Sequence, residues 1–429
     1  CNSLSLTKTN LKILELQIIG KKRGGGDFMI GLGLRLLAAT AAAALAFTAA
    51  ASAQDKVKIG YAISKTGPNA GGATITQIPN YEMWVKDVMA KGGLMVGGKR
   101  VPIEVIEYDD RSNSEEAVRA VERLVTQDKV DLLFPPWGTG LNLAVGPVFN
   151  KYGYPQLAFS AVTDRAPDLA KRWPNSFWLL GTSKQYVDAL TGLLKKLRDE
   201  GKIGPNIAMI SIADGFGIDL SQAARKGFTD AGFKLAYDKS YPIGTQDLSP
   251  LIGEASRSGA DTFVAFSYPP DTLALTEQAK VASYAPKVMF LGVGVGFPLY
   301  PQRFGANVEG IMSLGGWSKD NASTQAYAKK HEEMFKRGPD RWGSQIGYAS
   351  LQMLEQAIER AGKIDRAAIV KELQTGTFDT VLGKVKLVDN MMQDNFWLIG
   401  QWQDGFFAGV APQRAGVSPV VVPKPAWKP

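Results

Sequence analysis

Two apolar runs between Val130 and Asp164 decide the fold of this chain: VDLLFPPWGTG at residues 130–140 and YPQLAFSAVTD at residues 154–164. Each run stops abruptly and is followed by small and hydroxyl residues, a pattern typical of a buried parallel strand that leads into a helix. Two neighbouring strand ends form a crevice at the carboxyl edge of an open α/β sheet, where ligands bind. Because the free N–H groups at the start of the following helices favour an anion, we expect a ligand that carries a carboxylate.

The same alternation of strand and helix extends through most of the sequence. Strands are predicted at 56–62, 101–108 and 130–134, with amphipathic helices between them, and the pattern starts again after residue 186. Short connections in a β-α-β-α-β order are typical of a doubly wound parallel sheet. We therefore predict an α/β fold with two similar doubly wound parallel-sheet lobes.

The composition excludes several classes of function. The chain has 429 residues, 45% of them hydrophobic, which is enough for two domains. Half of the net charge of +8 lies in the first 53 residues, and no basic tract with interleaved aromatics follows, so we expect no nucleic-acid partner. Cys1 and His331 are the only cysteine and histidine, so neither a disulfide nor a Cys/His metal site can form, and we expect no metal or cofactor. His331 is expected on the solvated face of a helix.

The stretch from Met29 to Ala53 has the features of a secretory signal peptide. Arg35 precedes an apolar run that ends at Phe47, and Ala51-Ser52-Ala53 is a small-residue cleavage pattern before Gln54. The run is too short for a transmembrane helix. We expect a mature periplasmic protein that begins near Gln54, and we leave residues 1–28 out of the prediction of the fold.

The order of elements and several short motifs resemble the periplasmic solute-binding proteins of the Leu/Ile/Val-binding family, the receptors of branched-chain amino acid ABC importers. The resemblance covers nearly all of residues 55–412. It is carried by Lys58-Ile59-Gly60, Thr66-Gly67-Pro68, Lys91-Gly92-Gly93, Glu107-Tyr108-Asp109-Asp110, Ala213-Asp214-Gly215-Phe216-Gly217, Tyr268-Pro269, Phe378-Asp379-Thr380 and Gly383-Lys384-Val385.

This resemblance implies two lobes joined by a three-segment hinge that close around a small ligand, as in type I periplasmic binding proteins. One lobe would comprise residues 54–180 and 315–390, and the other residues 181–314 and 391–429. The implied partner is the membrane permease of an ABC importer, and we expect a monomer.

The resemblance also implies a set of ligand-binding residues. Gly138 and Thr139 match the first carboxylate anchor, and Ala161 with Thr163 matches the second, although the loop at 160–165 is one residue shorter than in the amino-acid binders. On the opposite lobe, Phe216 and Tyr268 stand where the family places aromatic residues.

One position departs from the family pattern. Gly294 stands where amino-acid binders place an acid for the ligand's ammonium group, and a buried ammonium without a partner is very costly. Trp137 adds a large apolar surface at the crevice. We therefore favour an aromatic or aliphatic acid as ligand, while Asp214 or Asp271 could compensate a positive charge and keep an amino acid or amide open.

Each of these residues also has an ordinary structural interpretation. Trp137 could be a core residue, Thr139 and Thr163 could be helix N-caps, and Phe216 and Tyr268 could be loop aromatics. The pair at 109–110 favours a strand-end cap over a metal site, because the spacing of a calcium loop is missing. The glycines between 292 and 296 lack the G-x-G-x-x-G spacing of a dinucleotide site.

Three functions remain open from the sequence. The first is capture of a small carboxylate outside the membrane for a permease, which requires no catalytic group. The second is a secreted α/β enzyme, for which only a carboxylate pair is available. The third is a ligand-sensing subunit of a membrane receptor, which would share the fold but not the partner.

Overall fold

The fold described here is that of a computed structural model, which describes residues 56–317, 321–392 and 399–429. The predicted signal peptide lies outside these residues. The two apolar runs form short strands, β5 (Leu132–Phe134) and β6 (Gln156–Ala158), each buried along its whole length. Both are shorter than predicted. β5 starts two residues later and ends at Phe134 as expected, before the prolines, while β6 starts after the Tyr154-Pro155 step and ends one residue earlier.

Two groups of strands surround the residues quoted first. A three-stranded parallel sheet has the order β4-β1-β5, and a five-stranded sheet has the order β13-β14-β15-β7-β6. β5 and β6 lie next to each other, although no ladder joins their two sheets. The further strands are β1 (Val57–Ile63), β2 (Leu94–Val96), β3 (Lys99–Val101), β4 (Ile103–Asp109), β7 (Ser176–Trp178), β13 (Thr377–Thr380), β14 (Gly383–Val388) and β15 (Met391–Met392).

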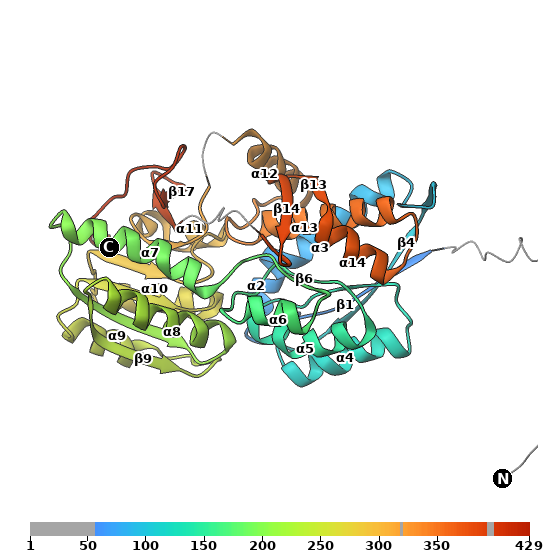
Figure 1. The fold of residues 1–429 in the computed structure, drawn as a ribbon. Helices are drawn as coiled ribbons and strands as arrows, with labels where there is room; N and C mark the ends of the chain where they lie inside the picture. Colours follow the sequence, from blue (N-terminus) through green and yellow to red (C-terminus); the bar gives the residue numbers. More distant parts are fainter. Residues whose placement is uncertain (1–55, 318–320, 393–398) are drawn as a thin grey trace, which may run out of the picture. The chain divides into compact units, whose positions relative to one another are not determined.

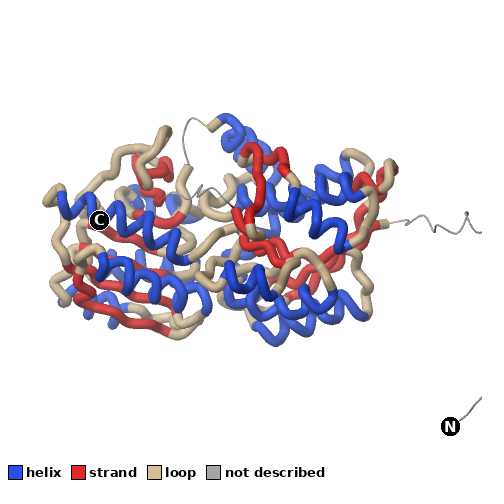
Figure 2. The backbone as a smooth tube through the Cα atoms, in the orientation of Figure 1, coloured by secondary structure: helices blue, strands red, loops and turns tan. Residues whose placement is uncertain are grey.

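Helices accompany these strands, as Figures 1 and 2 show. α4 packs on β1 and on α5, and α13 packs on α3 and α14. The helices of this group are α2 (Ala70–Gly72), the π-helical turn η1 (Ala73–Gln77), α3 (Ile78–Ala90), α4 (Ser114–Thr126), α5 (Thr139–Tyr152), α6 (Ala166–Arg172), α12 (Ala322–Phe335), α13 (Ser344–Ala361) and α14 (Arg366–Thr375).

The other strands form one seven-stranded sheet in the order β17-β16-β12-β11-β10-β8-β9. The strands from β12 to β9 are parallel, and β16 and β17 add an antiparallel edge. The strands of this sheet and the helices between them are α7 (Ser183–Asp199), β8 (Asn206–Ile212), α8 (Gly215–Asp230), β9 (Lys234–Tyr241), α9 (Ser249–Arg257), β10 (Thr262–Phe266), α10 (Pro269–Val281), β11 (Val288–Leu291), α11 (Leu299–Phe304), η2 (Gly305–Val308), β12 (Met312–Leu314), β16 (Ile399–Gln403) and β17 (Phe406–Ala411).

The predicted α/β class with parallel sheets is therefore confirmed. The exact residues at which one lobe passes into the other stay a prediction. Among the residues that the structure describes, no helix combines the length and the apolar character needed to cross a membrane.

His331 corrects one prediction from the sequence. Its side chain is fully buried in α12 rather than solvated, between the rings of Tyr327 and Phe335. Nδ1 bonds to the backbone oxygen of Arg337, and burial lowers the pKa of the ring below its usual value. A neutral imidazole can be buried in this way because desolvation penalises only its charged form.

The C-terminal segment from residue 420 is extended and held by hydrogen bonds. Val421 exchanges two bonds with the side chain of Gln401, and the backbone N–H of Lys424 donates to Lys287. The indole of Trp427 donates to the backbone oxygen of Tyr284 over 2.8 Å. These bonds fasten residues 420–428 to the seven-stranded sheet and its loops.

We predict that Trp427→Ala lowers the free energy of unfolding by about 1 to 3 kcal/mol, because it removes the indole bond and partly buried aromatic surface. Urea unfolding measures this loss. Lys428→Ala is the matched control, since the Lys428 side chain is exposed and its backbone bond to Asn307 remains. Equal midpoints for both variants would mean that the tail adds nothing to stability.

Candidate functional site

Three aromatic residues from strand ends meet where the crevice was expected. Trp137 follows β5, Phe216 opens α8 after β8, and Tyr268 follows β10. The ring centroids of Trp137 and Tyr268 are 5.0 Å apart, and those of Phe216 and Tyr268 are 5.1 Å apart with the planes at 23°. All three side chains are buried. Parallel strands place their carboxyl ends at one edge of a sheet, so both sheets contribute to this cluster.

Asp214 lies beside the cluster as the N-cap of α8. Oδ1 accepts from the backbone N–H groups of Phe216 and Gly217 at 3.1 and 3.0 Å, and Oδ2 accepts from the Tyr268 hydroxyl at 2.8 Å. A Cβ at Gly140 would lie 3.7 Å from Oδ2, so this carboxylate faces the start of α5 on the other sheet. Burial raises the pKa of Asp214 above its usual value, and these hydrogen bonds only partly oppose that rise.

Asp271, in the first turn of α10, is a second buried acid in this region. Its Oδ2 accepts from the Tyr268 backbone N–H and from the Tyr241 hydroxyl, both at 3.3 Å. Burial raises the pKa of Asp271 to about 6, and the negative charge of Asp214 adds to the rise. The region therefore holds two carboxylates for which ionisation is costly.

The loop before α5 is built from residues predicted as the first anchor. Gly138 has φ of +94°, a conformation that favours glycine, and its N–H donates to the Ser160 hydroxyl over 3.2 Å. The Thr139 hydroxyl accepts from the Val162 N–H at 3.0 Å and contacts the Val162 oxygen at 3.3 Å. Thr139 therefore fixes the 160–163 loop and contacts protein groups.

Thr163, predicted as the second anchor, donates its hydroxyl to Asp219 of α8. Arg165 also lies near this acid, with Nε 3.7 Å from Oδ2. Ala161 packs in a separate apolar cluster that includes Trp173 and Trp178. The structure thus brings Trp137, Gly138, Thr139, Phe216 and Tyr268 together, whereas Ala161 faces a different group of side chains.

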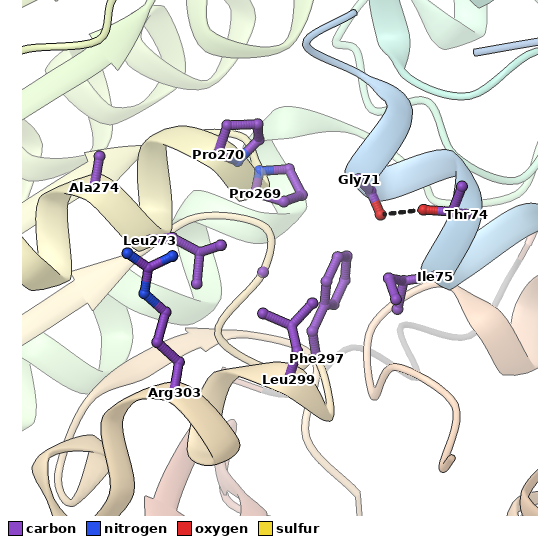
Figure 3. A pocket seen from close by; sticks show the side chains of 11 residues that line it. Gly71, Thr74, Ile75, Pro269, Pro270, Leu273, Ala274, Phe297, Leu299 and Arg303 are labelled. Atoms are coloured by element: carbon purple, nitrogen blue, oxygen red, sulfur yellow. Dashed lines mark hydrogen bonds between the residues drawn. The ribbon is translucent and has the colours of Figure 1, made fainter. Parts of the chain in front are cut away.

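A cavity of about 460 Å³ lies next to this cluster. It opens between the α2–η1 segment and the start of α10, with the loop after β11 and the start of α11 as its floor (Figure 3). Its lining residues are Gly71, Thr74, Ile75, Pro269, Pro270, Leu273, Ala274, Gly294, Phe297, Leu299 and Arg303.

The wall of this cavity is mostly apolar and carries no acid among its described lining residues. Arg303 is the charged member, and it pairs with Glu277 outside the lining set. Gly294 has φ of +119°, and a Cβ there would lie 3.1 Å from Pro269 Cα. The backbone conformation and the tight contact therefore both disfavour an acidic side chain at this position.

Of the residues predicted from the sequence, Gly294 is the one among the cavity's lining residues. The lining residues missed were mainly those of α10, α11 and the α2–η1 segment. The glycines at 71–72 gave one usable signal, because Gly72 leaves space for a neighbour: a Cβ there would lie 2.1 Å from the Trp137 ring. Leu299 and Arg303 gave no such signal, because a short helix of mixed polar and apolar residues has no recognisable sequence pattern.

Asp109 and Asp110 act as caps at the end of a strand, which is the structural role predicted for them. Asp109 accepts from the backbone N–H groups of Lys65, Thr66 and Arg111, and Asp110 accepts from Ser64 and Ser112. These bonds fasten the loop that leads to α2. No cluster of three or more potential metal ligands occurs among the described residues.

A family model described as "Periplasmic binding protein" matches residues 56–405. The chain belongs to this family. Its members are solute-binding proteins and not enzymes, so the predicted family and the non-catalytic role are confirmed. Among curated relatives, Leu/Ile/Val-binding protein homolog 7 of Brucella suis is 25% identical over 401 residues, which are 87% of this chain and 96% of the relative.

Solved periplasmic binding proteins have the same fold. A solute-binding protein of an ABC transporter from R. palustris, in complex with benzoate, is 19% identical with a TM-score of 0.71, covering 86% of this chain and 97% of its own. The branched-chain amino acid binding protein LivJ from Streptococcus pneumoniae, in complex with isoleucine, is 20% identical with a TM-score of 0.71, covering 83% and 100%. At these identities the likeness establishes the fold alone.

We predict that Asp271 contributes a rise in the stability of this periplasmic binding protein as the pH falls from about 7 toward 4. The pKa of Asp271 is about 6 in the folded state against 3.8 as the ordinary value, so the folded state binds protons more tightly and folding is favoured on acidification. Asp271→Asn should raise the free energy of unfolding at pH 8 by about 1 to 3 kcal/mol and flatten this pH dependence. Urea unfolding at pH 5 and pH 8 tests both points, with Asp230→Asn as an exposed control. A loss of stability at pH 8 specific to Asp271→Asn would contradict the prediction.

Proposed function

We propose that this chain is the periplasmic receptor of an ABC importer and captures a small carboxylic acid with an aromatic or aliphatic body. It would close around the acid and deliver it to a membrane permease. In this proposal an α-amino acid is a poorer ligand than an acid without an amino group.

The wall of the cavity is the observation that carries this proposal. A volume of about 460 Å³ lies within the usual range for small-molecule sites. Phe297, Leu273 and Leu299 offer apolar surface, while Arg303 is the charged lining residue. With Gly294 in place of an acid, the described wall offers nothing to balance a buried ammonium group, and burying one would cost several kcal/mol.

Relatives of the same fold support both kinds of ligand. One protein from R. palustris was solved with benzoate and another from that species with 3,4-dihydroxy benzoic acid, whereas LivJ was solved with isoleucine. Aromatic acids are therefore ligands of known chemistry for this fold.

Two buried acids favour a second candidate, an amino acid or an amide. Asp214 and Asp271 both have pKa values raised by burial, so a ligand ammonium placed near them would relieve an existing cost. Neither residue lines the cavity, and both accept hydrogen bonds from Tyr268. The apolar acid accordingly remains the favoured ligand.

The predicted site residues have different parts in this proposal. Trp137, Phe216 and Tyr268 do not line the cavity and would support it from beside the start of α10, and Gly294 would leave space beside the ligand. Thr139 and Gly138 would hold the loop shape that brings α5 toward the ligand. Thr163 would act through its bond to Asp219, which joins the two halves of the site, and Ala161 would act only by packing beneath the loop.

The test is a titration of the mature protein, followed by tryptophan fluorescence, with benzoate, hexanoate, leucine and valine. We expect saturable binding of at least one acid in the micromolar range and at least tenfold weaker binding of the amino acids. Mass spectrometry of the bound ligand should show no product. Tight binding of leucine or valine without binding of the acids would refute the preference for acids and favour the second candidate.

A second prediction tests the cavity itself. Leu299→Ala should weaken binding of the preferred acid about tenfold, because it removes apolar surface worth roughly 1 to 2 kcal/mol from the wall. Val281→Ala is the matched control, since Val281 is 83% exposed at the end of α10 and does not line the cavity. If both variants bind like the wild type, the ligand does not use this wall.

A further inference from the structure

Arg341 is a partly buried cation that forms no ion pair with the residues that the structure describes. It lies in the segment between α12 and α13, and no carboxylate lies within ion-pair distance of its guanidinium among the described residues. The guanidinium is 4.1 Å from the ring centroid of Phe406 and 5.3 Å from that of Trp317. Burial alone lowers the pKa of Arg341 to about 10. The guanidinium has lost contact with water, and no charged partner within the described ranges compensates for this loss.

The hydrogen bonds of Arg341 leave most of its donors unused. A guanidinium has five N–H donors, and here Nη1 reaches the Phe407 oxygen over a long 3.4 Å. Arg366 shows the contrast: it also forms no ion pair within the described part of the chain, but it donates to Tyr152, Tyr154 and Val130. Arg341 therefore has donors in a half-buried position that no described protein group accepts from and that a bound anion could use.

The acid next to Arg341 in the sequence does not pair with its guanidinium. The adjacent Asp340 is fully buried and accepts from the N–H groups of Trp342 and Gly343 and from the Ser344 hydroxyl. It is thereby committed to the first turn of α13. The positive charge of Arg341 is left facing an aromatic enclosure.

The position of Arg341 connects this enclosure with the ligand cavity. Its backbone N–H donates to the Gly296 oxygen over 3.2 Å, and Gly296 stands between Gly294 and Phe297, which both line the cavity. On the other side, the Gly316 N–H donates to the Arg341 oxygen over 2.9 Å, next to Trp317. Arg341 thus lies where the chain returns from the seven-stranded sheet.

We propose that the guanidinium of Arg341, between Trp317 and Phe406, is an anion-binding site that takes a carboxylate or a small oxyanion. A planar guanidinium matches such groups through paired hydrogen bonds, and the two rings restrict it to few orientations. The anion is either the carboxylate of the captured ligand, in which case this inference rests on the proposed function, or a free inorganic anion, in which case it does not.

The first arm of the test measures binding of benzoate and of neutral benzamide at constant ionic strength by calorimetry. If the ligand's carboxylate is the anion, Arg341→Met should weaken benzoate about 10- to 100-fold and benzamide by less than threefold. Arg341→Lys, which keeps the charge but not the planar fork, should fall between. Arg257→Met is the control, because Arg257 is exposed at the end of α9 and does not line the cavity. Arg303→Met tests whether the cavity's own arginine binds the carboxylate instead.

The second arm measures thermal unfolding with inorganic phosphate or sulfate against chloride at equal ionic strength. If a free anion binds, phosphate or sulfate should raise the melting temperature of the wild type but not of Arg341→Met. Arg341→Gln carries the same comparison if the methionine variant fails to fold.

The inference is overturned if the folded variants and the wild type respond alike in both arms. Loss of benzoate binding in Arg303→Met alone would also overturn it, since the carboxylate would then pair with Arg303. A wild type that binds no acid in the ligand panel would refute the proposed function, while the phosphate arm would still decide whether Arg341 binds an anion.

Discussion

Tyr268 is the central side chain of the contact between the two sheets at their carboxyl edges. Its ring packs between Trp137 and Phe216, and its hydroxyl donates to Asp214 over 2.8 Å. Aromatic pairs of this kind contribute about 0.5 to 1.5 kcal/mol each beyond the area they bury. The hydroxyl bond matters as well, because it supplies Asp214 with a donor after burial has removed water. One side chain therefore connects the aromatic cluster beside the cavity with the nearest acid, which the N-cap bonds of α8 also hold.

The sequence contained enough information to predict that strand ends would supply this cluster. Trp137 and Tyr268 each follow an apolar run, and parallel strands bring their carboxyl ends to one edge. Periodicity predicted the alternation of elements, because burial on both faces demands continuous apolar runs. It could not predict that the rings would pack on each other, since their contact joins residues more than a hundred positions apart.

The hydrogen-bond and packing partners of polar side chains could not be predicted from the sequence. Thr163 was expected at a ligand, but its hydroxyl donates to Asp219, an ordinary-looking residue on an amphipathic helix. His331 was expected in water because its neighbours in sequence are charged, whereas the fold buries it against Tyr327 and Phe335. In both cases the sequence predicts the local element correctly, but not which groups the side chain contacts in the fold. The absence of an acid at Gly294 was readable, because it depends on the identity of one residue alone.

The distribution of charge around the cavity constrains how an acid would lie in the proposed receptor. Asp214 and Asp271 are already costly to ionise, and a ligand carboxylate placed beside them would raise that cost through like-charge repulsion. Arg303 lines the cavity at α11, and Arg341 is joined to its Gly294–Phe297 wall through the backbone of Gly296. An acid would therefore direct its carboxylate away from the Tyr268 side and place its apolar body against Leu273, Phe297 and Leu299. An amino acid in the same orientation would bring its ammonium close to the arginines, because both charged groups share one carbon. The arrangement that suits an acid is thus unfavourable for an amino acid, even without a clash of shape.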